Sequence, residues 1–242
     1  MEEHVSAALD SRATVTGLAL RPRATWSALQ GAQGRRLWVP AVLIAGLTVL
    51  LVLVTAYADT HYRYGLDMDW FEQQSTGPAP ELASVRFDAA ALSALGALGA
   101  LGLQWVVVTG ALLLLGRLFG ERRLSRADAV TLALWGWLPF IFRALLQLGF
   151  TAATGRPIYN LGLSGLVYDA TPPPLTAIRY VTPSSARWAT AALLRGVDLF
   201  AGWHVLLTGW GLAAFARIPP RKALALTAVV WLAALPLYLV TG

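Results

Sequence analysis

The chain has 242 residues, of which 57% are hydrophobic and only 13% charged, and its mean hydropathy is +0.58. A soluble domain has about 25% charged residues, so this composition excludes an ordinary water-soluble protein and predicts a membrane protein. The net charge of +6 comes from arginines at the edges of apolar blocks. Membrane topology explains arginines in those places, and we therefore expect no nucleic-acid partner.

Residues 1–36 form a polar to amphipathic segment before the first apolar block. In residues 15–30, the apolar Leu18, Trp26 and Leu29 alternate with arginines. This pattern predicts a short helix on the inner membrane face, with Trp26 at headgroup depth. A solvated tail with one amphipathic turn is the alternative. Because the segment has no apolar h-region, the first apolar block is expected to act as a retained signal anchor.

Five apolar blocks, each long enough to cross a bilayer, follow one another from residue 37. They predict transmembrane spans over residues 37–58, 89–118, 129–152, 191–216 and 220–240. The fold class is therefore an all-α polytopic membrane bundle. Residues 1–36 are its cytoplasmic segment, and residues 37–242 are one five-helix transmembrane domain with long loops over 59–88 and 153–190.

Basic residues between the spans predict the orientation of the chain. The segments that share a side with the N-terminus hold twelve of the 19 basic residues, and the opposite loops hold five. The positive-inside rule therefore places the N-terminus in the cytoplasm and the C-terminus outside. Abundant Arg, Ala, Leu and Gly are typical of a GC-rich bacterial genome, so the expected location is the bacterial cytoplasmic (inner) membrane.

Four polar residues inside the predicted spans form a candidate site, since ionisable groups are costly in a membrane unless paired or hydrated. Arg143 and Gln147 share a face of the third span, and Arg195 and Asp198 share a face of the fourth. Arg143 lies about 13 Å and Asp198 about 10 Å below the outer edge, so a contact between them is available. The cluster is interpreted either as a structural clamp between two helices or as a site for an anionic lipid headgroup or solute.

Glycines and a proline within the spans predict how the helices pack. Gly96, Gly99 and Gly102 follow at intervals of three in the second span and permit close approach of another helix. Compositional drift in an Ala/Gly-rich chain is the alternative explanation. Pro139 in the middle of the third span removes a backbone hydrogen bond and predicts a helix kink.

No soluble catalytic motif occurs in the sequence, and we expect neither enzymatic activity nor a cofactor. The chain has no cysteine, which excludes disulfides and thiolate chemistry. His4, His61 and His204 fall in three different compartments of the predicted topology, so no metal site is expected. His204 is expected to form a hydrogen bond to a neighbouring helix.

Several short motifs resemble those of the Yip family, the Ypt/Rab-interacting membrane proteins and their bacterial relatives. Pro22-Arg23-Ala24-Thr25-Trp26 is similar to the family's Pro-x-x-Thr-aromatic entry before the first span. Leu138-Pro139 lies inside the third span, and Arg221-Lys222-Ala223 opens the last one, as in the family. The resemblance extends over residues 18–240.

The resemblance implies five spans with a cytoplasmic N-terminus. Eukaryotic members act in vesicle trafficking and bind prenylated small GTPases, but their acidic-Leu-x-Gly-Pro signature is absent here, so GTPase binding is not expected. Some bacterial relatives are associated with ABC-type exporters. The predicted function is a non-enzymatic scaffold or accessory subunit of a membrane transport or envelope-associated complex. A small transporter, or a protein that binds an anionic lipid or solute at the Arg/Asp cluster, is the alternative. Expected partners are membrane lipids and another membrane protein, such as an ABC-type exporter, or a second copy of the chain.

Overall fold

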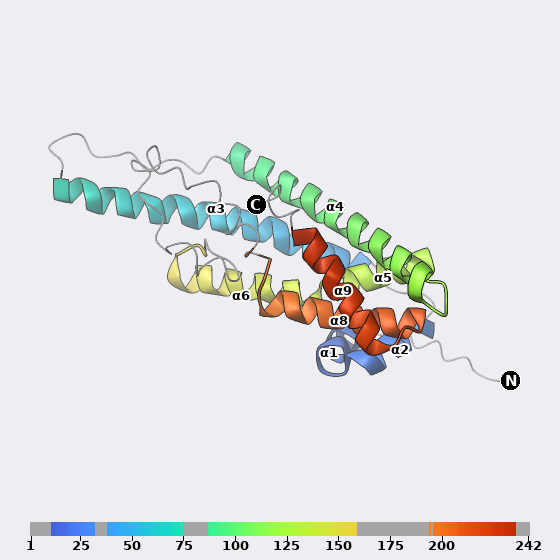
Figure 1. The fold of residues 1–242 in the computed structure, drawn as a ribbon. Helices are drawn as coiled ribbons and strands as arrows, with labels where there is room; N and C mark the ends of the chain where they lie inside the picture. Colours follow the sequence, from blue (N-terminus) through green and yellow to red (C-terminus); the bar gives the residue numbers. More distant parts are fainter. Residues whose placement is uncertain (1–10, 32–37, 75–86, 159–193, 195, 236–242) are drawn as a thin grey trace. The chain divides into compact units, whose positions relative to one another are not determined.

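The computed structural model describes residues 11–31, 38–74, 87–158, 194 and 196–235. These residues form helices and turns, and no strand occurs among them, which confirms the all-α class for this part of the chain. In chain order the helices are α1 (Ser11–Leu20), α2 (Pro22–Gly31), α3 (Trp38–Gln74), α4 (Phe87–Phe119), α5 (Arg126–Gly136), α6 (Leu138–Thr154), α8 (Leu199–Ala216) and α9 (Pro220–Ala234) (Figure 1).

The chain divides into two compact units that each combine segments distant in sequence. The first unit consists of Met1–Ala45, Ala100–Ile141 and Phe200–Ala234, and the second of Gly46–Gly99, Phe142–Leu199 and Leu235–Gly242. The helix break before Pro139 belongs to the first unit, and Arg143 with Asp198 belongs to the second. The helix break and the Arg143–Asp198 pair therefore lie in different units.

Four helical stretches of the described residues are long and apolar enough to cross a membrane. They are Val39–Asp59 in α3, Ala90–Phe119 in α4, Arg126–Thr154 over α5 and α6, and Leu199–Ala216 in α8. The predicted span over 220–240 corresponds to α9, of which 15 residues are described, while residues 236–242 lie outside the described part. Five spans and the orientation of the termini therefore stay predictions.

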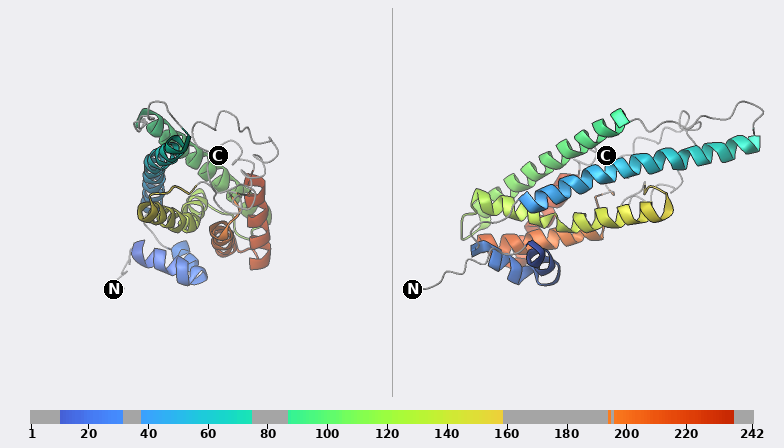
Figure 2. Two further views of the ribbon diagram at one scale, coloured as in Figure 1. Left: turned by 90° about the vertical axis from the view of Figure 1, so that its left-hand side faces the viewer. Right: turned by 180° about the vertical axis from the view of Figure 1, so that it is seen from behind.

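The N-terminal segment forms two short helices where the sequence predicted one. α1 and α2 meet at Arg21, directly before Pro22, because proline disfavours helical backbone in the preceding residue. Trp26 of α2 is fully buried, and its ring lies edge-to-face on Phe215 of α8 at a centroid distance of 5.9 Å. Protein therefore covers the side chain, and the predicted position of Trp26 at headgroup depth stays a prediction. Figure 2 shows α1 and α2 beside α8 from two further directions.

α3 continues as a helix to Gln74, so the loop predicted to begin at Asp59 is wrong for residues 59–74. No proline interrupts this stretch, because the next one is Pro78. Within it, Nδ1–H of His61 donates to the carbonyl of Tyr57 at 2.8 Å, one helical turn earlier. The apolar part of α3 nevertheless ends at Asp59, one residue after the predicted end of the span at residue 58.

α8 begins at Leu199, whereas the predicted fourth span began at residue 191. Residues 196–198 form a turn before the helix. Asp198 therefore occupies the position directly before the first helical residue, where aspartate is favoured. The prediction that Asp198 and Arg195 share a helical face is wrong for Asp198, because it is not within a helix, and Arg195 lies outside the described residues.

Candidate functional site

An ion pair connects α6 to the start of α8 in the second unit. The guanidinium NH1 of Arg143 lies 3.0 Å from Oδ2 of Asp198. The two side chains are only 13% and 14% exposed, so the contact is largely shielded by protein. A charge in the bilayer is stabilised by an oppositely charged partner at such a distance. The structure thus brings together the two residues whose predicted depths matched.

The other two residues of the predicted polar cluster, Gln147 and Arg195, have no described part in this ion pair. Gln147 is buried on α6, one helical turn after Arg143. Arg195 lies outside the described residues. What the cluster does, whether it clamps two helices or binds an anion, stays a prediction.

The helix break predicted from Pro139 lies at Trp137, between α5 and α6. The N–H of Trp137 donates to the carbonyl of Leu134 at 3.2 Å, and the N–H of Phe140 donates to the carbonyl of Trp137 at 2.9 Å. In an uninterrupted α-helix the N–H of Phe140 would instead bond to the carbonyl of Gly136. The break therefore frees the carbonyl of Gly136 within an apolar core.

His204 of α8 satisfies this freed carbonyl. Its Nδ1 lies 2.7 Å from the carbonyl oxygen of Gly136. Because a carbonyl only accepts hydrogen bonds, Nδ1 carries the proton. An unsatisfied carbonyl is costly in an apolar environment, so this bond stabilises both the break and the contact between α5 and α8. The interhelical hydrogen bond predicted for His204 is confirmed.

Aromatic rings surround the imidazole of His204, which is only 2% exposed. Its centroid lies 5.0 Å from Trp231 of α9, 5.4 Å from Phe140 of α6 and 6.0 Å from Trp137 at the break. Trp105 of α4 contacts Trp137 edge-to-face at 6.4 Å. These rings exclude water from the hydrogen bond and hold helices of the first unit around it. The arrangement is that of a packed structural centre.

Three glycines of the first unit allow close contacts between helices. A Cβ at Gly136 would lie 2.5 Å from Oγ1 of Thr208, and one at Gly209 would lie 2.7 Å from Cδ2 of Leu224 in α9. A Cβ at Gly211 would overlap Cδ2 of Leu132. The sequence pattern predicted no packing role for these glycines, because they give no periodic signal along an apolar helix.

The glycines singled out in the sequence behave differently. A Cβ built at Gly96, Gly99 or Gly102 of α4 meets no atom of the described residues within 4 Å. Gly96 and Gly99 are exposed, as are Leu92 and Leu103 on the same helix. The described part of the chain therefore does not use these glycines for packing, and their predicted contact with another helix stays a prediction.

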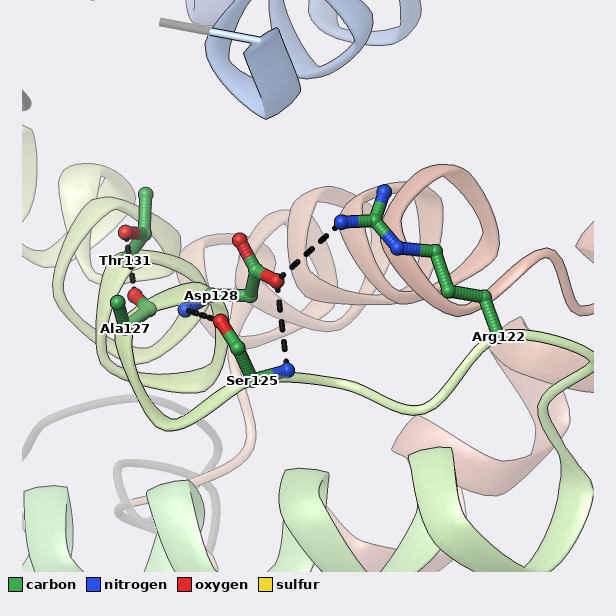
Figure 3. A network of polar contacts seen from close by, with 5 residues as sticks. All are labelled: Arg122, Ser125, Ala127, Asp128 and Thr131. Carbon is green, nitrogen blue, oxygen red and sulfur yellow. Dashed lines mark hydrogen bonds and ion pairs between the residues drawn. The ribbon is translucent and has the colours of Figure 1, made fainter. Parts of the chain in front are cut away.

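A capping box starts α5 after the basic turn between α4 and α5. Ser125 Oγ accepts from the N–H of Asp128 at 3.1 Å, and Asp128 Oδ2 accepts from the N–H of Ser125 at 3.3 Å (Figure 3). Arg122 reaches the same carboxylate oxygen at 3.9 Å. The Ser-x-x-Asp spacing before an apolar run is a helix-start signal that the sequence analysis overlooked. This network fixes the turn by satisfying the first amides of α5.

Among the described residues, no group of three His, Asp or Glu side chains could hold a metal ion. His61 and His204 are in different units. His4 lies outside the described residues.

Apolar helices long enough to cross a membrane, connected by polar contacts that join helix to helix, define the protein as a helical multi-span membrane protein. The chain matches the Yip1 domain over residues 16–241, and it belongs to the Yip family. This confirms the family resemblance seen in the short motifs. Comparison with curated proteins and with solved structures gave no match.

Proposed function

We propose that this Yip-family chain is a non-enzymatic scaffold or accessory subunit of a membrane transport or envelope-associated complex in the bacterial inner membrane. The observation that carries the proposal is the uneven covering of the spans. In an apolar segment of 18 residues within α5–α6 and in the 18 residues of α8, 61% and 50% of residues are buried inside the chain. In the corresponding segments of α3 and α4 the shares are 11% and 22%.

The exposed side of α4 carries glycines as well as large apolar side chains. Gly96, Gly99, Leu103 and Val106 follow at intervals of three or four residues, which places them on one face of the helix. Helices associate in lipid through close packing at small residues, since lipid tails are as apolar as leucine. A second membrane protein therefore has a specific place to pack. An ABC-type exporter is the partner that the family resemblance implies, and a second copy of the chain is the other candidate.

The ion pair favours the clamp over the transporter as its role. Asp198 already provides Arg143 with a carboxylate at 3.0 Å, so an anionic ligand would have to displace it. The pair also connects α6 to the segment just before α8, a contact that fixes the register of two spans. We therefore assign Arg143 and Asp198 a structural role within the proposed subunit.

The proposed orientation has five spans, with the N-terminus in the cytoplasm. The excess of basic residues in the segments 1–36, 117–128 and 217–222 supports it through the positive-inside rule. α9 would then be the cytoplasmic beginning of the fifth span, and the C-terminus would lie outside.

Photo-crosslinking combined with native mass spectrometry tests the proposed docking on α4. A photoreactive residue at Leu103 is expected to capture in the membrane the same protein that co-purifies in mild detergent. Gly99→Leu is expected to abolish both signals, because it adds bulk to the packing face. Gly202→Leu on α8 is the matched control, since Gly202 is also exposed and free of neighbours within 4 Å among the described residues.

The crosslinked protein identifies the partner, and the variants decide whether the contact is specific. Loss with Gly99→Leu and retention with Gly202→Leu support the scaffold or accessory subunit. A wild-type chain that stays folded, crosslinks only to lipid and runs as a monomer overturns the proposal. Equal loss of the crosslink and of co-purification in both variants would show a general disruption of the fold. That outcome also contradicts the proposal.

A further inference from the structure

A pocket of about 400 Å³ lies in the first unit, where α8 ends and α9 begins. Its wall is formed by α2, by the start of the turn after α4, and by the junction of α8 with α9. The polar and aromatic lining residues are Arg23, Ser27, Glu121, Trp210 and Arg217, and the apolar ones are Ala213, Ala214, Ile218, Pro219 and Pro220. The pocket contains none of the residues of the ion pair or of the His204 centre.

The charges of the lining favour an anionic ligand. Arg23 and Arg217 contribute two positive charges against the single negative charge of Glu121. The guanidinium of Arg23 lies over the ring of Trp210, 5.3 Å from its centroid, which orients the side chain along the pocket wall. Arg217 has a φ of 55°, the left-handed conformation that ends α8 and turns the chain toward α9.

The beginning of α9 adds to this positive potential. Pro219 and Pro220 line the pocket, so the N-terminal end of the helix faces it. Prolines carry no N–H, so the amides that this helix end offers are those of Arg221 and Lys222, and together with the macrodipole they attract anions. Arg221 and Lys222 follow directly, and both are exposed. A helix end and two arginines, Arg23 and Arg217, therefore act on the same small volume.

The position of the pocket indicates that the ligand is an amphiphile. The apolar span of α4 ends at Phe119, two positions before Glu121, and that of α8 ends at Ala216, directly before Arg217. The pocket thus lies at the level where two spans leave the hydrocarbon. Ala213, Ala214 and Ile218 form an apolar side of the wall next to the arginines. A free phosphate has no apolar group to pack on this surface, whereas the glycerol and first acyl carbons of a phospholipid would pack on it.

We propose that this pocket binds the phosphodiester headgroup of an anionic phospholipid. The phosphate lies between Arg23, Arg217 and the beginning of α9, and the glycerol backbone lies against the alanines of α8. The site is independent of the proposed docking face on α4. Bound lipid would tie α2 and the α8–α9 junction to the membrane surface, on the side to which the basic turns belong.

Lipid binding to the full chain in mild detergent tests the proposal, with native mass spectrometry as the readout. Phosphatidylglycerol is expected to bind more tightly than phosphatidylcholine of the same acyl chains. Arg23→Gln/Arg217→Gln is expected to weaken phosphatidylglycerol binding about thirtyfold, since each basic residue near the surface contributes about 1 kcal/mol. The matched control is Arg126→Gln/Arg156→Gln, which removes the same charge outside the pocket and should change binding less than about twofold.

Two further arms separate the pocket from general charge and the lipid from a free anion. Ala214→Trp keeps every arginine but fills the apolar side, and it is expected to abolish the preference for phosphatidylglycerol. Inorganic phosphate at millimolar concentration is expected not to displace the lipid. Equal binding of both lipids, equal losses in the pocket and control variants, or unchanged binding in Ala214→Trp overturns the proposal. Displacement by inorganic phosphate contradicts the lipid and assigns the pocket to a free anion. Unchanged thermal unfolding of each variant shows that its fold is intact.

Discussion

The spans formed by α5–α6 and α8 differ from those of α3 and α4 in how they are held. The first pair contains a helix break, a buried histidine, an ion pair and glycines in tight contact with neighbouring side chains. The spans of α3 and α4 are long uninterrupted helices whose described surfaces are mostly apolar and uncovered. Lipid offers no hydrophobic reason for helices to associate, so packing and polar contacts must hold the first pair together.

This difference shows which residues are expected to matter for the isolated chain. Changes to polar contacts in α5, α6 and α8 should lower the free energy of unfolding, because a lost partner in an apolar environment is not replaced by water. Changes on α4 should affect association with a partner and leave the isolated chain stable. Three predictions test this contrast, and each uses the free energy of unfolding of the purified chain in mixed micelles with increasing dodecyl sulfate.

The largest effect is expected from the ion pair. Asp198→Asn removes the carboxylate 3.0 Å from Arg143 and should lower the free energy of unfolding by about 3–5 kcal/mol, since it leaves a shielded positive charge without this carboxylate. The neutral double variant Arg143→Gln/Asp198→Asn should lose clearly less, because it leaves no charge behind. A single variant as stable as the wild type, or a double variant worse than the single one, would show that the pair is not a clamp.

A smaller effect is expected from the histidine at the helix break. His204→Leu leaves the carbonyl of Gly136 without its donor and should lower the free energy of unfolding by about 1–3 kcal/mol. Pro139→Ala restores an amide and permits a continuous helix in which Phe140 can bond to this carbonyl. In the double variant the loss caused by His204→Leu should therefore shrink.

If the losses of unfolding free energy from His204→Leu and Pro139→Ala simply add in the double variant, the hydrogen bond of His204 does not compensate for the helix break. His61→Leu is the control for loss of an imidazole. That side chain is exposed, and its contacts are to Tyr57 one turn earlier, a hydrogen bond to the carbonyl and a ring contact at 4.0 Å, so its effect should stay within about 0.5 kcal/mol.

The contact between Arg143 and Asp198 was predictable because it depends on depth in the membrane. Counting residues from the outer ends of two spans places both side chains at similar depths, and charges in lipid need partners. The contact is present although α8 begins only after Asp198, while the depths themselves stay predictions. The all-helical, membrane-spanning character followed from composition in the same way.

The acceptor for His204 was not predictable, although the kink at Pro139 and the interhelical role of His204 each were. Connecting them requires knowing that α5 and α8 meet where the helix breaks, which is a property of tertiary packing. Trp26 is a second example, because the amphipathic pattern does not predict that Phe215 of α8 packs against this side chain. The pattern alone also favoured Gly96, Gly99 and Gly102 over Gly209 and Gly211, although only the latter have close neighbours among the described residues.

The smallest effect comes from adding a single methyl group in the two regions. In Gly209→Ala the new Cβ would lie 2.7 Å from Cδ2 and 3.1 Å from the backbone Cα of Leu224, so α8 and α9 must move apart. In Gly99→Ala the methyl group meets no described atom within 4 Å. Both variants gain similar helix propensity, so the difference between them reports packing alone. Gly209→Ala should be about 1–3 kcal/mol less stable than Gly99→Ala. If the two variants are equally stable, α4 is as closely covered as α8, and the contrast between the two regions fails.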